Sequence, residues 1–173
     1  MLIDAYPGSE RRTVEGVLPF HWACTNAHTK TTAEYLYKIY PESINVADGR
    51  SGGYPIHCPM YGITRPIGKS GNPETAVEIL RFLLDCDPNV ASHRNARGEL
   101  PLYYACQEVS SQSQLSRVIS DTLRFIKLVF DVYPQAIEDP LMTNLHRMGS
   151  LPCTFCCETK GVSYFSSSNA MIS

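Results

Sequence analysis

The stretch GVLPFHWAC, residues 16–24, has three further copies in this chain of 173 residues. A glycine stands two or three residues before a proline in every copy, and successive prolines are 36, 46 and 51 residues apart. The other copies are GGYPIHCPM at 52–60, GELPLYYAC at 98–106 and GSLPCTFCC at 149–157. Proline fits the first position of a helix, because its fixed φ is already helical and its missing N–H would have no partner there. Each copy therefore predicts the start of a short helix.

A second repeated feature is a proline that follows an amphipathic run of residues. These prolines are Pro41, Pro88 and Pro134, in KIYPESI, DCDPNVA and DVYPQAI. Apolar residues recur eight, five and two positions before each proline, and this spacing places them on one stripe of a helix. In chain order they are Ala33, Leu36 and Ile39; Leu80, Leu83 and Cys86; and Ile126, Val129 and Val132. Because proline cannot supply the N–H that continues a helix, we expect a longer helix to end at each of these prolines.

Together the two features define a repeating unit of loop, short helix, connection and longer helix. One unit cannot cover its own apolar stripe, so neighbouring units must stack. We therefore predict an all-α solenoid of stacked helix-turn-helix repeats with projecting loops, in a single domain over residues 1–161. Its parts would be the tail of a truncated repeat (1–15), three repeats (16–51, 52–97 and 98–148) and a capping repeat (149–161), followed by a frayed C-terminal tail (162–173).

The first copy carries a resemblance to a known family. LPFHWA at 18–23 resembles the T-P-L-H-x-A signature of the ankyrin repeat, and YPIHCP and LPLYYA resemble it more loosely. The resemblance covers residues 5–160, although leucine or tyrosine replaces the threonine and the histidine is kept only as His21 and His57. It implies paired antiparallel helices, hairpin-like loops and a concave surface. The implied function is a non-enzymatic scaffold or adaptor that binds an unidentified protein on its concave face and loop tips, without a cofactor.

The third residue after each repeat proline is a candidate for partner binding, since in ankyrin repeats this position tends to lie towards the concave surface. It is aromatic in three copies, as Trp22, Tyr104 and Phe155, and it is Cys58 in the other. Aromatic residues dominate binding hot spots, so we predict that Trp22, Tyr104 and Phe155 contact the partner. The alternative is that they pack between adjacent short helices.

Two long connections between helices are a second candidate surface, because insertions in solenoids gather on one face and often bind. They separate Met60 from Leu80 and Cys106 from Ile126, and the second contains SSQSQLSRVIS. Neutral drift in tolerated surface loops explains them equally well. In the short helix before the first connection, Pro59 removes an early backbone hydrogen bond, so we expect this helix to be short or distorted.

The stretch LPCTFCCETKG, residues 151–161, holds three of the seven cysteines. Aligned with the other copies, these cysteines occupy positions of small or apolar residues, which predicts core packing. Zinc is an alternative, because Cys153 and Cys156 have a suitable spacing and His146 could join them, but no second C-x-x-C pair completes four ligands. The runner-up function is therefore a small metal-binding or thiol-redox protein that uses the C-terminal cysteines.

Other patterns with chemical potential give no catalytic residues. His21 with Cys24, and His57 with Cys58, pair a base with a thiol. However, Cys24 faces the predicted core, where burial suppresses ionisation. GITRPIGKSGNP at 62–73 departs from the phosphate-binding loop in its glycine spacing and follows no strand, which indicates a flexible connection. We expect no enzymatic activity, no cofactor and no metal.

The composition agrees with one globular domain, since 43% of the residues are hydrophobic and 18% are charged. A net charge of −2 gives no electrostatic case for nucleic acid. No apolar run approaches the roughly 20 residues that span a bilayer, and MLIDAYPGSE lacks the pattern of a secretory signal. Seven cysteines cannot pair completely within one chain, so we expect an intracellular, cytoplasmic protein with reduced thiols. The truncated first unit also allows a structural piece of a longer repeat array.

Overall fold

The computed structural model describes residues 7–26, 29–64, 72–111 and 116–147. Over these ranges its regular elements are helices, apart from one isolated bridge between Val14 and Val17. The α-helices are α2 (Pro19–Asn26), α3 (Lys30–Ile39), α4 (Pro59–Thr64), α5 (Pro73–Cys86), α6 (Pro101–Ser111), α7 (Ser116–Val132) and α8 (Pro140–Arg147). The 3-10 helices are η1 (Ser9–Arg11), η2 (Pro41–Asn45), η3 (Pro55–His57), η4 (Pro88–Ser92) and η5 (Pro134–Glu138). The described part of the chain is thus all-α.

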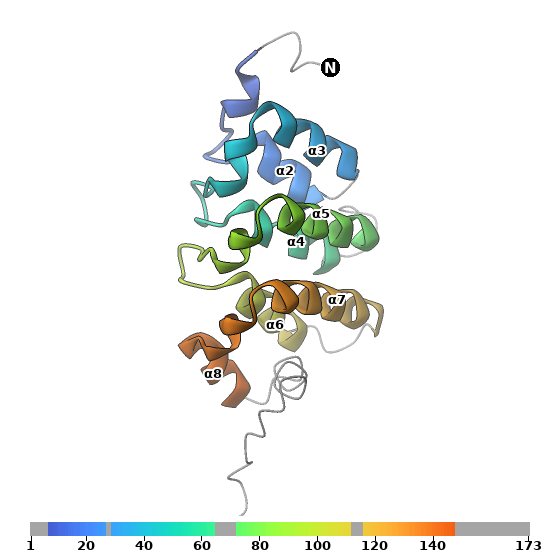
Figure 1. Ribbon diagram of the computed structural model, residues 1–173, viewed down its shortest axis with the longest axis vertical. Coiled ribbons are helices and arrows are strands. Elements are labelled where there is room, and N and C mark those ends of the chain that lie inside the picture. The colour runs from blue at the N-terminus through green and yellow to red at the C-terminus, as the bar shows by residue number, and fades with distance from the viewer. Residues whose placement is uncertain (1–6, 27–28, 65–71, 112–115, 148–173) are drawn as a thin grey trace, which may run out of the picture.

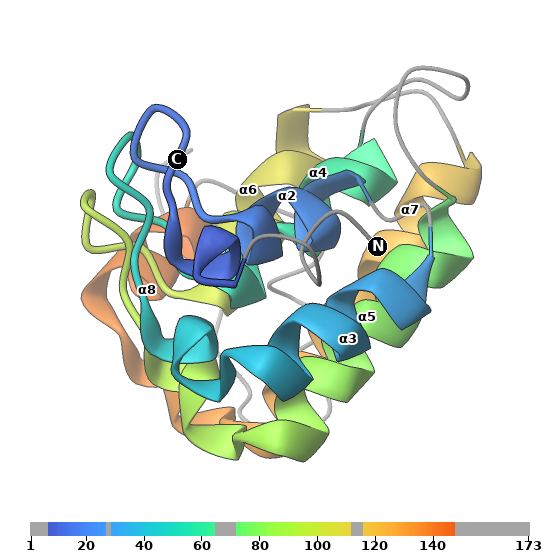
Figure 2. The ribbon, with the colours of Figure 1, turned by 90° about the horizontal axis from the view of Figure 1, so that it is seen from above.

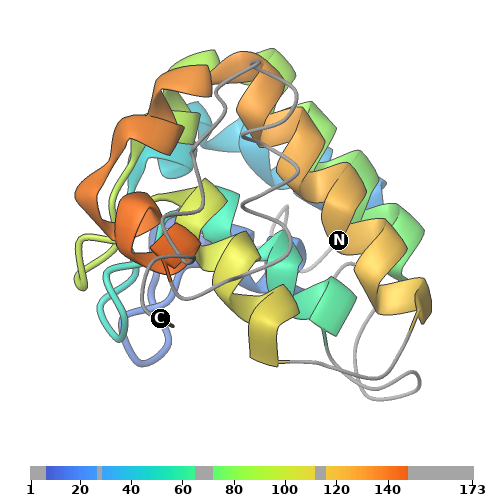
Figure 3. The ribbon, with the colours of Figure 1, turned by 90° about the horizontal axis from the view of Figure 1, so that it is seen from below.

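The helices are arranged in pairs that follow one another along the long axis of the molecule (Figure 1). α2 and α3 form the first layer, α4 and α5 the second, and α6 and α7 the third. We call α2, α4 and α6 the inner helices and α3, α5 and α7 the outer helices, because the two sets lie on opposite sides of the stack (Figure 2). α8 packs against α6 at the far end, as the view from below shows (Figure 3).

Prolines mark the helix boundaries where the sequence predicts them. Pro19 and Pro101 are the first residues of α2 and α6, and Pro55 is the first residue of η3. Each outer helix ends two residues before a proline, and that proline opens η2, η4 or η5. At η4 the Asp87 carboxylate accepts a hydrogen bond from the Asn89 N–H at 3.0 Å, so this aspartate caps the turn that follows α5.

The inner helix of the second layer is interrupted, which confirms the prediction made from Pro59. It consists of the three residues of η3, then Cys58, and then a six-residue α4 that begins at Pro59 itself. Proline has no N–H to donate to the carbonyl four residues earlier. The Pro55 carbonyl instead accepts from the Cys58 N–H at 3.1 Å, so a 3-10 turn replaces the first α-helical turn.

The predicted apolar stripes of the outer helices form the core. The positions eight and five residues before the proline are at most 5% exposed: Ala33, Leu36, Leu80, Leu83, Ile126 and Val129. The first residue after each repeat proline is buried as well: Phe20, Ile56 and Leu102. The position two residues before the proline differs, since Ile39 and Cys86 are half-buried and Val132 is 39% exposed. This position therefore lies at the edge of the stripe.

The structure corrects the prediction of a long connection around SSQSQLSRVIS. Residues 110–111 belong to α6 and residues 116–120 belong to α7, so most of the segment is helical. The buried stripe of α7 continues upstream through Phe125 and Thr122, which are fully buried, and a longer apolar stripe stabilises additional helical turns. The other predicted connection falls largely on residues 65–71, outside the described part of the chain.

α8 has no counterpart among the sequence predictions. The Asp139 carboxylate accepts from the Leu141 N–H at 2.9 Å, and Pro140 is the first helical residue. Met142 and Leu145 are buried. An Asp-Pro start followed by apolar residues three apart is a helix signal, and it was overlooked because it falls between the repeated features. The capping repeat predicted at 149–161 and the tail at 162–173 lie outside the described residues.

Candidate functional site

Three loops project from the same side of the stack and lie one above another (Figures 1 and 2). We call residues 12–18 the first loop, residues 46–54 the second loop and residues 93–100 the third loop. Backbone hydrogen bonds join them, since the Gly49 N–H donates to the Gly16 carbonyl at 2.8 Å and the Ala96 N–H donates to the Ser51 carbonyl at 3.1 Å. The loops therefore form a connected edge rather than three independent segments.

Glycine is required where two of these loops touch. Gly16 has a φ of +81°, and a Cβ there would lie 2.9 Å from the Gly49 Cα. Gly52 has a φ of +63°, and a Cβ there would lie 2.7 Å from the Ala96 Cβ. Both the left-handed backbone and the close approach exclude a side chain. Gly16 and Gly52, which are shared by the repeat copies, thus allow neighbouring loops to stack.

Short polar side chains fold the second and third loops internally. The Asp48 carboxylate accepts from the backbone N–H groups of Arg50, Ser51 and Gly53 at 2.6–3.1 Å. The Asn95 side-chain oxygen accepts from the N–H groups of Arg97 and Glu99 at 2.9 and 3.0 Å. Aspartate and asparagine commonly stabilise turns in this way.

Ion pairs add links between elements that are far apart in sequence. Arg50 pairs with Glu15 of the first loop. Arg94 pairs with Asp139 at 2.5 Å and also donates to the Gly98 carbonyl at 2.9 Å. The third loop is thereby attached to the start of α8.

The two histidines of the repeat signature attach inner helices to the loops that follow. The His21 Nε2 lies 3.0 Å from the Val46 carbonyl, and the His57 Nε2 lies 3.3 Å from the Glu99 carbonyl. The His57 Nδ1 accepts from the Tyr54 N–H at 3.2 Å, so its proton is on Nε2, which donates to Glu99. Burial is the largest influence on both rings, and it lowers the pKa of His21 and of His57. Both rings serve as neutral structural links.

The cysteines beside these histidines are poor nucleophiles. Burial raises the pKa of Cys24 well above its usual value and raises that of Cys58 to about 12. Cys24 and Cys106 are fully buried at the fifth position after the proline, as the register predicts. Cys153 and the other two cysteines of 151–161 lie outside the described residues. Among the residues that are described, no group of three or more His, Cys, Asp or Glu side chains is arranged to hold a metal ion.

In the second and third layers, the third position after the repeat proline faces the preceding inner helix. Cys58 is buried and close to Cys24 of α2, and the Tyr104 ring lies 5.7 Å from the Tyr61 ring of α4 and 6.3 Å from the His57 ring, between centroids. Tyr104 is half-buried in this packing, which is the alternative considered for the aromatic positions. Trp22 belongs to the first layer and is 40% exposed. The predicted ladder is therefore open at Trp22 and packed at Tyr104, and Phe155 lies outside the described residues.

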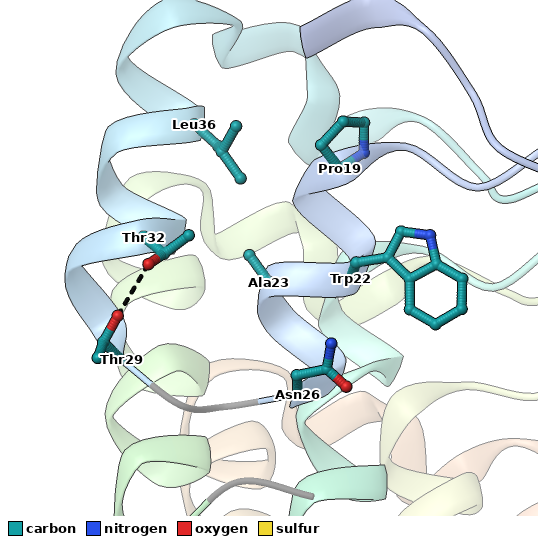
Figure 4. Close-up of a pocket in the computed structure, with 7 residues that line it drawn as sticks. All are labelled: Pro19, Trp22, Ala23, Asn26, Thr29, Thr32 and Leu36. Atoms are coloured by element: carbon teal, nitrogen blue, oxygen red, sulfur yellow. Dashed lines mark hydrogen bonds between the residues drawn. The ribbon is translucent and has the colours of Figure 1, made fainter. Parts of the chain in front are cut away.

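A groove of about 430 Å³ lies between α2 and α3 on the exposed face of the first layer (Figure 4). It is lined by Pro19, Trp22, Ala23, Asn26, Thr29, Thr32 and Leu36. None of these side chains is charged. The indole of Trp22 projects from the side of α2 that faces away from α3 (Figure 4). The sequence singled out Trp22, whereas it gave no signal for the two threonines, because their position matters only beside α2.

No protein-family model matches this chain, and no curated protein or solved structure is significantly similar to it. None of the helices in the described ranges is long and apolar enough to cross a membrane.

Proposed function

We propose that the chain is a non-enzymatic protein-interaction module, an ankyrin-like solenoid that acts as a scaffold or adaptor. It binds a partner protein on its concave face and loop tips. The observation that supports this function most is the exposed Trp22, which stands beside an uncharged groove on an otherwise well-packed stack. A large aromatic side chain that is open to solvent next to a groove is typical of binding hot spots.

The ankyrin-like assignment draws support from four features of the described layers. Each inner helix begins at, or one turn after, a proline, and each layer projects a loop on the same side. Glycines permit the loops to stack, and the histidines of the signature connect each inner helix to the following loop. None of these features requires a cofactor or a reactive side chain.

The stacked loops and layers favour binding without large rearrangement. Each loop is held by its own side-chain hydrogen bonds and by its neighbour, so little loop entropy is lost on binding. An intracellular, cytoplasmic location belongs to the same proposal. It agrees with the four free cysteines in the described part of the chain, since reduced thiols are typical of that compartment.

Affinity purification followed by mass spectrometry tests this function. The double variant Trp22→Ala with Tyr104→Ala should lose at least one protein that the wild-type chain captures, because it removes the two proposed aromatic contact residues that lie in the described part of the chain. Val132→Ala, which shortens an exposed apolar residue on α7, serves as the control and should capture the same proteins as the wild type. Circular dichroism of each variant checks that the stack is intact. An identical set of captured proteins with the folded double variant would contradict the aromatic contribution.

A further inference from the structure

The exposed face of the first layer repeats a surface that is covered in the other layers. In the second layer, Pro55, Cys58 and Pro59 face α2 and are all buried. The equivalent residues of the third layer face α4, and Pro101 and Ala105 among them are buried. The equivalent residues of the first layer are Pro19, Trp22 and Ala23, which line the groove and are partly or largely exposed. The helix face that packs against the preceding layer in the second and third layers is therefore exposed in the first layer.

The α3 side of this face is more polar than the equivalent surfaces of α5 and α7. Nine and twelve residues before the proline, α5 has Ile79 and Ala76 and α7 has Phe125 and Thr122, all fully buried. The corresponding residues of the first layer are Thr32 of α3 and Thr29, which directly precedes α3; both are exposed and their hydroxyls lie 2.8 Å apart. The α2 side of the groove therefore keeps the apolar surface of an interior layer, whereas the α3 side has a polar surface suited to water.

We propose that this groove binds a single amphipathic helix of a partner protein. The proposal rests on the proposed function and identifies the kind of partner element that is recognised. A helix fits because the equivalent face of each lower layer is covered by a helix of the layer above, so the groove continues an interface that the molecule already uses twice.

The two halves of the groove indicate one helix rather than a further helix pair. A second helix over α3 would bury the hydroxyl of Thr32 at the position where the lower layers have Ile79 and Phe125. A single helix over α2 instead places its apolar stripe on Pro19, Trp22 and Ala23, and directs its polar side towards the threonines. Apolar residues at i, i+3, i+4 and i+7 provide such a stripe. Because no lining residue is charged, the bound face should be uncharged.

A selection with a phage-displayed library of single-helix peptides tests the proposal on the full chain. Thr32→Arg places a long charged side chain in the groove from an exposed helical position, and Thr31→Arg places the same side chain on α3 outside the groove lining. We expect enriched peptides with the apolar spacing given above. Their affinity should fall at least tenfold for Thr32→Arg and should stay within twofold for Thr31→Arg.

Trp22 is the only tryptophan of the chain and lines the groove from α2, so its fluorescence reports a helix bound over α2. Binding of a selected peptide that lacks tryptophan should shift the emission of Trp22 to shorter wavelength, because the indole loses contact with water. Peptides that bind Thr32→Arg as tightly as wild type, or a library that yields none above background, would overturn the helix-binding groove.

The same variants separate this proposal from the proposed function. If a captured partner is lost with the Trp22→Ala and Tyr104→Ala variant but bound normally by Thr32→Arg, the interaction module stands and the groove inference fails. If neither variant changes the captured proteins, the aromatic contribution and the groove inference both fail.

Discussion

The middle of the stack and its first layer use the same register for different purposes. In the second layer, the face towards the preceding helices is buried, and the ring of His57 has partners on both nitrogens. In the first layer, the same face presents Trp22 to solvent, and the ring of His21 contacts the Val46 carbonyl through Nε2. A repeat position therefore acquires its role from the layer in which it lies. Stability resides in the covered faces, and the proposed recognition uses the uncovered one.

Truncation of equivalent outer-helix residues in different layers tests the difference between the covered and the exposed face with the largest expected effect. Phe125→Ala should destabilise the protein by about 3–5 kcal/mol, because it opens a cavity in a fully buried site. Thr32→Ala, at the equivalent exposed position of α3, should change the free energy of unfolding by less than about 0.5 kcal/mol. Urea unfolding followed by circular dichroism measures both. Equal losses for the two variants would contradict an exposed first-layer face.

Two glycines offer a second comparison between the middle and the end of the loop edge. Gly52→Ala should cost about 3 kcal/mol, because it combines a positive φ with a contact of 2.7 Å to Ala96. Gly98→Ala should cost only about 1–2 kcal/mol, since its φ is also positive but a Cβ there meets nothing within 4 Å. Thermal and urea unfolding of both variants measure the difference. A cost for Gly98→Ala as large as that for Gly52→Ala would show that stacking of the loops contributes little.

The pH dependence of the free energy of unfolding compares the two signature histidines of the first and second layers. Burial lowers the pKa of His21 and His57 in the folded state below the ordinary value of about 6.5, so the unfolded chain binds more protons as the solution becomes acidic. Their stabilising contribution is complete above pH 6.5 and is lost as the pH falls towards the folded pKa. The free energy of unfolding should therefore decrease by at most about 1.4 kcal/mol per pH unit for each histidine. His57→Gln should flatten this dependence more than His21→Gln, because protonation of His57 also breaks its bond from Tyr54.

Urea unfolding at pH 5, 6 and 7 gives these slopes, with His28→Gln as a further histidine variant outside the repeat signature. A slope that is unchanged in both signature variants would assign the pH dependence to other groups.

The smallest expected effect concerns the C-terminal cysteines. Because Cys153, Cys156 and Cys157 share the register of apolar positions, Cys153→Ser should leave the metal content of the purified protein unchanged at zero. Inductively coupled plasma mass spectrometry measures this content. Stoichiometric zinc that is lost on Cys153→Ser would favour the metal-binding alternative.

Local signals in the sequence predicted much of the fold. The prolines at 19, 55 and 101 set the starts of inner helices, and the stripe ending at Leu83 or Val129 identified the core face of the outer ones. These signals depend on residues within a turn or two of each other. The length of α7 was not predicted, because its first turns carry Ser116, Arg117 and Ser120 and depend on the buried Phe125 and Thr122 further along the helix.

The candidate site was less predictable because it depends on contacts between distant residues. The bond from Gly49 to Gly16 and the bond from Ala96 to Ser51 join separate repeats. Trp22 and Tyr104 occupy equivalent positions in the repeat, and only their layers explain why one is open and the other packed. An alignment of the four repeat copies places Trp22 and Tyr104 at the same position and cannot distinguish their environments.

The two backbone hydrogen bonds between the loops can each be followed by amide hydrogen exchange. The amide hydrogen of Gly49 is protected from exchange with solvent only while the first and second loops remain together, and that of Ala96 only while the second and third do. Their exchange rates with deuterium therefore report two separate opening events. If the molecule unravels from one end, these two protons will record the order in which its layers come apart.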